Sequence, residues 1–143
     1  MKNRAWALVL LGLIGLMTTP AHGQGGGQDR PAVQLEQNYP NPFNPETTIP
    51  FTLGEAFWEN GSRPVVSLRI YNVLAQLVAI PVLQGTGEVL DNLELEWNGT
   101  GRYRAYWDGR ISQTDREAAS GVYVYQLIVN GRSAGSKKMT IIK

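Results

Sequence analysis

The sequence predicts an all-β fold, and three features of the residue pattern support this prediction. From about residue 35 onward, apolar and polar residues alternate in short runs, which is the period of a strand with one buried face. Gly, Pro, Asn and Asp separate these runs and mark turns. No stretch repeats apolar residues at the helical period, and the nearest, Glu88–Glu96, also alternates. The 143 residues suffice for one domain with one core.

The N-terminal segment has the three parts of a secretory signal peptide. Lys2 and Arg4 make a short positive region, residues 5–17 are apolar and uncharged, and small residues follow. We expect signal peptidase to cleave after Gly23 and to leave Gln24 as the first residue. A retained membrane anchor is the alternative, but a spanning helix needs about 20 apolar residues and this run is shorter. The predicted organisation is a signal peptide over residues 1–23, a flexible glycine-rich linker over 24–34, and one β-domain over 35–143.

The composition excludes several kinds of function. The chain has no cysteine, and its single histidine, His22, leaves with the signal peptide. The mature chain therefore lacks a thiol nucleophile, a histidine general base and any cysteine- or histidine-bound metal, and we expect no cofactor. Two of the 13 basic residues also leave while all 12 acidic ones stay, so the net charge becomes −1. A charge this close to zero lacks the basic field that nucleic-acid-binding proteins use.

Seven short runs have strand patterning. Pro50 in the first run has no N–H to donate, which predicts an edge strand or a bulge there. Asn130-Gly131 separates the last two runs and predicts a tight hairpin, because both residues tolerate positive φ. Seven strands with turns at this spacing indicate a single immunoglobulin-like β-sandwich. The expected strands are Thr48–Leu53, Val65–Tyr71, Gln76–Val82 (apolar on both faces and expected to be covered on each), Leu93–Trp97, Tyr103–Trp107, Val122–Val129 and Lys137–Ile142.

A proline-rich segment, Asn38–Pro45, leads into the first of these strands. Its three prolines fix φ, remove three donors and favour extended conformations in the residues before them, so the segment is stiff. Its asparagines are able to bond the local backbone, and Tyr39 and Phe43 are expected to pack against the end of the sandwich. A proline-rich spacer or a ligand for a proline-binding domain is the alternative, but neither explains the strand that follows at once.

This segment belongs to a set of motifs that occur in a fixed order. They are Asn38–Leu53 (NYPNPFNPETTIPFTL), Leu68–Asn72 (LRIYN), Trp107-Asp108-Gly109, Ala119–Leu127 (ASGVYVYQL) and Lys138–Lys143 (KMTIIK). In that order they resemble the type A C-terminal sorting domain of type IX secretion substrates. That family is similar in turn to the immunoglobulin-like domain of the flagellar hook-capping protein. The resemblance covers essentially all of residues 35–143.

The resemblance implies a non-enzymatic export and surface-display module. It implies that the Sec machinery exports the chain, that the type IX outer-membrane translocon recognises the folded domain, and that the product reaches the cell surface or the medium through the periplasm. The residues that it marks as structural or recognition positions are Asn38, Tyr39, Pro40, Asn41, Pro42, Phe43, Asn44, Pro45, Ile70, Tyr71, Asn72, Trp107, Asp108, Gly109, Ser120, Gly121, Tyr123, Lys138, Met139 and Lys143. The sequence departs from the family pattern at Asn72–Gln76, which contains no glycine although the family commonly has a glycine in this turn.

Two binding functions are alternatives. The first is a small secreted structural or adhesive subunit that pairs through strand edges with itself, as a homo-oligomer, or with a surface partner. The second is carbohydrate binding on an aromatic platform formed by Trp58, Trp97, Tyr103, Tyr106 and Trp107. Trp97, Tyr103 and Trp107 lie in alternating runs, which favours packing within the fold for them. Trp58 lies in the stretch Glu55–Arg63 and has no assigned core face.

An enzyme is the least favoured interpretation. Glu94 and Glu96 lie two apart on one strand face, and Asp108 and Asp115 share a loop region. Carboxylate pairs do acid–base chemistry when their environments separate their pKa values, and a solvated surface does not do so. The spacing of the two aspartates also lacks the density of oxygen ligands of a calcium loop, so no metal site is predicted.

Overall fold

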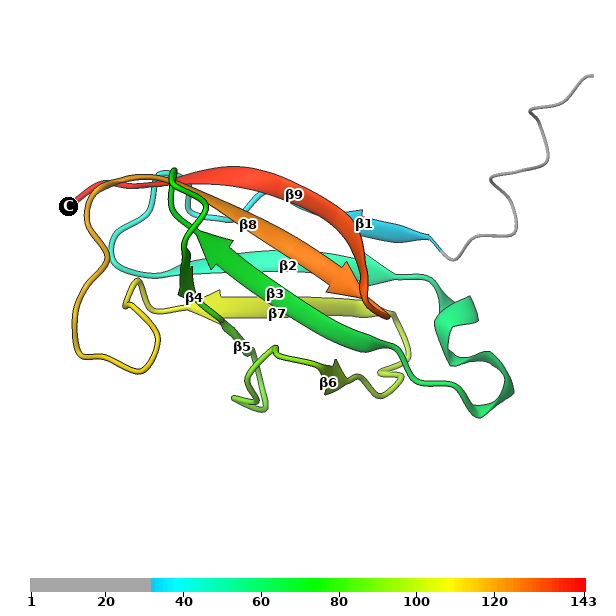
Figure 1. Ribbon diagram of the computed structural model, residues 1–143. Coiled ribbons are helices and arrows are strands. Elements are labelled where there is room, and N and C mark those ends of the chain that lie inside the picture. Colours follow the sequence, from blue (N-terminus) through cyan, green and yellow to red (C-terminus); the bar gives the residue numbers. More distant parts are fainter. Residues whose placement is uncertain (1–31) are drawn as a thin grey trace, which may run out of the picture.

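The computed structural model describes residues 32–143, which form an all-β fold of two antiparallel sheets (Figure 1). The predicted signal peptide, its cleavage site between Gly23 and Gln24, and most of the linker lie outside the described residues. The elements are β1 (Val33–Leu35), β2 (Thr47–Leu53), a 3-10 helix (Glu55–Gly61), β3 (Val65–Tyr71), β4 (Leu77–Ala79), β5 (Val82–Leu83), β6 (Leu93–Glu94), β7 (Arg102–Trp107), β8 (Gly121–Val129) and β9 (Arg132–Ile141).

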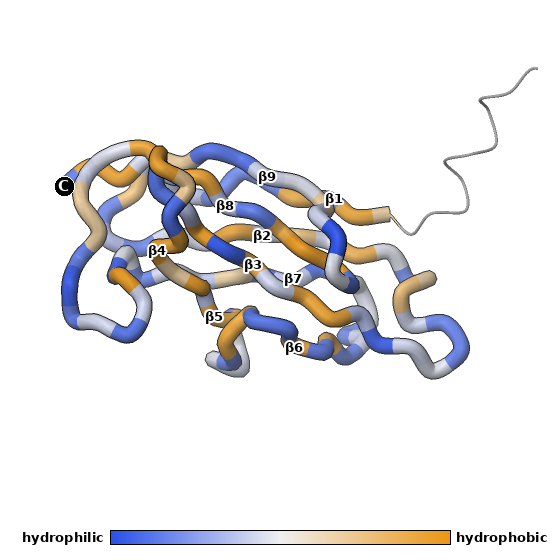
Figure 2. The backbone as a smooth tube through the Cα atoms, viewed as in Figure 1, coloured by the Kyte–Doolittle hydropathy of each residue, from blue (hydrophilic) through white to orange (hydrophobic). Residues whose placement is uncertain are grey.

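The core lies between the two sheets. One sheet has the order β1-β2-β7-β5; the other has the order β4-β3-β8-β9, with β6 also paired to β3. Alternate residues along the long strands are buried, and Figure 2 shows hydrophobic and hydrophilic residues alternating along these strands. Ile49 and Phe51 from one sheet and Leu68, Tyr125 and Leu127 from the other are among the buried residues. Within residues 32–143, no helix is long and apolar enough to span a bilayer.

Where apolar and polar residues alternate without interruption, the bounds of the predicted strands are close to those observed. The strand Val65–Tyr71 has the predicted bounds, and β2, β7 and β8 each begin one residue earlier than predicted. Asn130 and Gly131 have φ of 51° and 78° and form the predicted hairpin turn. The return strand β9 begins at Arg132 instead of Lys137, because a two-residue turn starts the return strand at once.

The prediction of one doubly covered strand over Gln76–Val82 is wrong. The stretch contains β4, which pairs with β3, and the start of β5, which pairs with β7 in the other sheet. The chain changes sheet at Ile80 and Pro81. Proline has no N–H for a ladder, and the N–H of Ile80 donates to the hydroxyl of Ser112 (2.8 Å) instead of to a strand.

The predicted strand Leu93–Trp97 is shorter than expected. Only Leu93 and Glu94 pair with β3, and the N–H of Leu95 then donates to the carbonyl of Pro64 just before β3 begins (2.9 Å). Trp97 lies beyond the reach of β3 and is 39% exposed. The expectation that Trp97 is a core or cross-strand residue is therefore only partly right.

The prediction that Pro50 lies in an edge strand or at a bulge is wrong, since β2 is paired on both sides without a register shift at this residue. Strand β2 lies between β7 and β1, and β1 includes Val33 and Gln34, which were assigned to the linker. Pro50 is tolerated because β1 ends at Leu35, beside Phe51. At Pro50 itself the only backbone group that needs a partner is its carbonyl, which accepts from the N–H of Glu36 (3.0 Å).

Candidate functional site

The motif residues come together at one end of the fold, where β9 ends. Phe43 forms a parallel bridge with Ile141. Its N–H donates to the carbonyl of Thr140 (3.0 Å), and its carbonyl accepts from the N–H of Ile142 (3.1 Å). The side-chain oxygen of Asn41 accepts from the N–H of Thr140 (3.1 Å). We call this end, formed by Asn38–Pro45, Trp107–Gly109, Ala119–Tyr123 and Lys138–Lys143, the motif end.

The proline-rich segment covers an exposed sheet edge. Strand β9 is the last strand of its sheet, so the outer backbone groups have no neighbouring strand. The bonds from Asn41 and Phe43 satisfy Thr140, and the side-chain amide of Gln37 donates to the carbonyl of Lys138 (2.8 Å). An uncovered edge is a template for pairing with other chains, so the segment protects the C-terminal half of β9.

Three aromatic rings pack beneath this segment. The ring of Trp107 contacts Phe43 and Tyr123 edge to face, with centroids 5.6 Å and 5.8 Å apart. The indole N–H of Trp107 donates to the carbonyl of Arg110 (2.8 Å), and the hydroxyl of Tyr123 donates to the carbonyl of Ala119 (2.7 Å). The buried polar atoms of these rings thus have partners, as burial requires.

Asn38 anchors the start of the segment and is 2% exposed. Its side-chain amide donates to the carbonyl of Pro40 (3.2 Å) and to the hydroxyl of Thr47 (3.0 Å), and that hydroxyl donates to the same carbonyl (3.0 Å). The backbone N–H of Asn38 donates to the hydroxyl of Tyr125 (3.0 Å), which donates to the carbonyl of Glu36 (2.7 Å). Burial raises the pKa of Tyr125 to about 12, although the bond from Asn38 opposes the shift.

The turn at Trp107-Asp108-Gly109 contacts the proline-rich segment directly. The carboxylate of Asp108 accepts from the N–H of Arg110 (3.0 Å), and the carbonyl of Gly109 accepts from the N–H of Ala118 (2.8 Å). Gly109 has φ of +80°, and a Cβ on it would lie 2.1 Å from the carbonyl oxygen of Pro45. This position therefore requires glycine, as the sequence motif has it.

The C-terminal residues are held to the loop before β8. The N–H of Lys143 donates to the hydroxyl of Ser120 (3.1 Å), and its ammonium lies 3.1 Å from the carboxylate of Glu117. The side chains of Lys143 and Glu117 are 38% and 60% exposed, so this solvated ion pair contributes little to stability. Met139 and Ile141 on the same strand are buried.

The motif Ile70-Tyr71-Asn72 forms the turn from β3 to β4. Ile70 is buried, and the side-chain oxygen of Asn72 accepts from the N–H groups of Leu74 (2.9 Å) and Gln76 (3.0 Å). Ala75 has positive φ (60°), a conformation that glycine adopts more easily than alanine. The bonds of the Asn72 side chain make this an Asx-type turn that contains no glycine.

The structure places exposed apolar side chains around this turn, and the sequence reasoning missed them. Tyr71 pairs with Leu77 and with Val124, and Gly121 pairs with Ile141, so the β3–β4 turn, the start of β8 and the end of β9 share one end of the five-stranded sheet (Figure 1). We call the following group the apolar patch, whose members are 43–75% exposed: Val73, Leu74, Leu77, Val122 and Ile142. The sequence did contain a signal for this patch, namely the apolar residues Val73 and Leu74 within a turn.

Not every motif residue is buried or bonded at this end. Tyr39 was expected to pack against the end of the fold, but its side chain is 48% exposed and only its backbone pairs, with Thr48. Asn44 and Pro42 are exposed, and so is the side chain of Lys138. Phe43 packs as expected.

The aromatic residues proposed as a carbohydrate platform have two different environments. Trp107 and Tyr103 are buried, so they pack within the fold as favoured. Trp58 is half-buried, stacks on Tyr103 and donates its indole N–H to the carbonyl of Leu95 (2.8 Å). Trp97 packs on Trp58 with ring centroids 5.0 Å apart and keeps one side exposed.

The carboxylates noted in the sequence are dispersed over the surface. Glu96 forms an exposed ion pair with Arg63 (3.3 Å), and Glu94 is exposed. Asp108 caps its own turn and Asp115 lies in the exposed loop that follows. Over residues 32–143, no three His, Asp or Glu side chains cluster in a way that would hold a metal ion.

Comparisons with known proteins bear on the fold alone. No protein-family model matches the sequence. No curated protein is significantly similar to it. The fold is similar to that of part of a solved structure, the Pseudomonas fluorescens alkylpurine DNA glycosylase AlkC bound to DNA containing an abasic site analog, at a TM-score of 0.50 and 16% identity. The match covers 80% of this chain but only 31% of the glycosylase.

Proposed function

We propose that this protein is an exported, non-enzymatic sorting and surface-display module with an immunoglobulin-like fold, recognised by a type IX outer-membrane translocon. The observation that carries the proposal is that motif residues from both ends of the described chain form one unit. Phe43, in the proline-rich segment, binds the backbone of Thr140 and Ile142 at the other end. A resemblance that rests on scattered motifs is supported when those motifs contact one another.

The proposed action is recognition of a folded surface. The motif end holds the two terminal segments together, and beside it the apolar patch exposes five aliphatic side chains. Exposed apolar clusters on small proteins mark sites of protein contact. We therefore propose the apolar patch, together with the adjoining motif end, as the surface that the translocon contacts after the Sec machinery has exported the chain and signal peptidase has cut after Gly23.

Edge pairing as an adhesive subunit is less well supported. The long strand β9 is the obvious edge for self-association, but Gln37, Asn41 and Phe43 already bond its outer backbone groups at Lys138 and Thr140. The covered C-terminal half of this edge therefore does not pair with another chain.

Expression of the full chain in a bacterium that has a type IX system, and in the same strain without the translocon, tests the proposal. We expect the mature chain, starting at Gln24 by intact mass, in the outer membrane or medium of the first strain and in the periplasm of the second. Periplasmic retention in both strains would reject the sorting function.

Variants then test the surface. The triple change Val73→Ser, Leu74→Ser and Leu77→Ser is expected to cause periplasmic accumulation, since it removes three exposed contacts. Val89→Ser is the control for removing an exposed apolar side chain, because Val89 is as exposed as Leu77 (both 53%) but lies outside the patch. Equal export of the two variants would exclude the apolar patch.

A further inference from the structure

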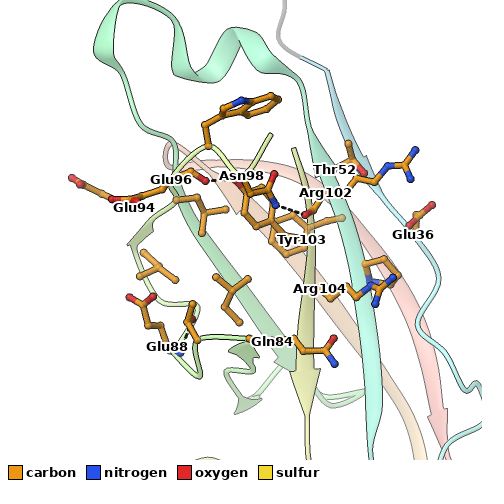
Figure 3. A pocket seen from close by; sticks show the side chains of 18 of the residues that line it. Glu36, Thr52, Gln84, Glu88, Glu94, Glu96, Asn98, Arg102, Tyr103 and Arg104 are labelled. Atoms are coloured by element: carbon orange, nitrogen blue, oxygen red, sulfur yellow. Dashed lines mark hydrogen bonds between the residues drawn. The ribbon is translucent and has the colours of Figure 1, made fainter. Parts of the chain in front are cut away.

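A polar groove lies along the four-stranded sheet and reaches the motif end at Tyr39. Its volume is about 1200 Å³. Part of its wall is the outer face of the sheet, where the register places Gln34 beside Thr52, Thr52 beside Arg102, and Pro50 beside Arg104. Glu88 and Glu94 lie on the opposite side (Figure 3), and Trp97 also lines the groove.

The groove contains hydrogen-bonding side chains that are free to bind a ligand. Arg102 and Arg104 are two residues apart on β7 and point to the same face. Both are exposed, and within residues 32–143 neither guanidinium makes an ion pair or a hydrogen bond, whereas Arg63 is paired with Glu96. Figure 3 shows the two arginines near Thr52 and Glu36, with Glu88 and Glu94 on the other side.

One end of the groove has a rigid aromatic surface. The indole of Trp97 packs on Trp58, which is itself held by its bond to the carbonyl of Leu95 and by stacking on Tyr103. Trp97 therefore keeps one orientation although it is 39% exposed. A preorganised apolar surface binds at a lower entropic cost than a mobile one.

We infer that this groove binds a neutral oligosaccharide. A sugar ring offers an apolar C–H face for Trp97 and hydroxyl groups that both donate and accept hydrogen bonds. Guanidinium, carboxylate and amide side chains on facing walls satisfy such hydroxyls. The charges of the lining nearly balance, with carboxylates at Glu36, Glu88, Glu94 and Glu96 against guanidiniums at Arg63, Arg102 and Arg104. This balance disfavours a polyanion.

An extended peptide fits the groove less well. A peptide that adds to a sheet needs free backbone groups on the edge strand. On β7 the carbonyl of Arg102 accepts from the side chain of Asn98 (2.7 Å), its N–H donates to the hydroxyl of Thr100 (3.1 Å), and the carbonyl of Arg104 accepts from the N–H of Gln84 (2.8 Å). The edge that borders the groove is thus largely satisfied.

Affinity electrophoresis of the mature chain in gels that contain neutral polysaccharides (dextran, laminarin, mannan and xylan) tests the inference, with alginate as the acidic comparison. We expect retardation by at least one neutral polymer and less by alginate. Trp97→Ala is expected to weaken that binding by about tenfold or more, because stacking on the sugar face is lost. Arg102→Gln with Arg104→Gln should weaken it as well.

Two variants on the other sheet serve as controls, Val122→Ala for the loss of an exposed apolar side chain and Arg132→Gln for the loss of an exposed charge. Both are expected to bind as the parent does. Absence of retardation in every neutral gel overturns the inference, and so does unchanged binding by Trp97→Ala. Stronger retardation by alginate than by any neutral polymer also overturns the inference. So does binding of an extended peptide in the groove in place of a saccharide.

Discussion

The hydroxyl of Tyr125 accepts a 3.0 Å hydrogen bond from the backbone N–H of Asn38, which lies 87 positions earlier in the chain. The same hydroxyl donates to the carbonyl of Glu36 (2.7 Å), so one side chain of the central strand β8 holds the start of the proline-rich segment at two points. Tyr125 is fully buried and its bond from Asn38 is buried with it, so water does not replace that bond.

Tyr125→Phe should reduce the free energy of unfolding by about 1–3 kcal/mol, because it leaves the buried N–H of Asn38 without a partner and removes the bond to the carbonyl of Glu36. Urea unfolding of both proteins measures the difference. Tyr71→Phe is the matched control, since Tyr71 is partly exposed and its hydroxyl makes no hydrogen bond within residues 32–143. Equal losses in the two variants would contradict this assignment.

Stability should fall at alkaline pH. Burial raises the pKa of Tyr125 from its ordinary value near 10 to about 12. The folded state therefore holds this proton more tightly than the unfolded state, and the resulting stabilisation is complete below pH 10 and lost as the pH rises through 12. Urea unfolding at a series of pH values should show this decline, with a smaller decline for Tyr125→Phe. A decline of the same size in both proteins would contradict the prediction.

The pKa of Tyr106 is also raised, but for a different reason. Its hydroxyl donates to the carboxylate of Glu46, and this hydrogen bond is the main cause that raises the pKa of Tyr106 to about 12. Glu46→Gln removes the charged acceptor and should lower the pKa of Tyr106 toward 10. Tyrosinate absorbance during a pH titration measures the shift, with Tyr106→Phe identifying the signal. An unchanged titration in Glu46→Gln would show that this bond does not control the group.

Gly109→Ala should be more destabilising than an alanine at another glycine of positive φ. A left-handed backbone costs a residue with Cβ about 1–2 kcal/mol. At Gly109 the new Cβ would also lie 2.1 Å from the carbonyl oxygen of Pro45, so the turn must move. Gly99→Ala is the control, because Gly99 has φ of +89° and open space around it. Similar unfolding midpoints for the two variants would show that the contact with Pro45 is unimportant.

Ala75→Gly should stabilise the protein by about 0.5–1 kcal/mol. Ala75 has φ of 60°. The strain of this left-handed conformation in alanine exceeds the extra chain entropy that glycine would lose on folding. Ala119→Gly is the comparison at an exposed alanine without positive φ, and it should destabilise. Thermal unfolding measures both changes, and a loss of stability in Ala75→Gly would contradict the argument.

The sequence by itself determined the all-β fold, the bounds of β3 and the turn at Asn130-Gly131, since alternation and positive-φ residues act over a few neighbouring positions. Strand β1 could not be predicted in the same way, because its three residues are stabilised by pairing with Thr52 and its neighbours rather than by their own pattern. The change of sheet at Pro81 and the exposure of Trp97 likewise depend on where partner strands begin and end.

For the candidate site, the sequence alone identified Phe43, Trp107 and Lys138 as motif positions but could not say what they contact. Only the tertiary structure brought Asn41 and Phe43 onto the outer edge of β9 and grouped Val73, Leu77 and Val122 into one patch. The physical reason is that local patterns encode which face of a strand is buried. Contacts between distant segments depend on how the two sheets pack and where each strand ends.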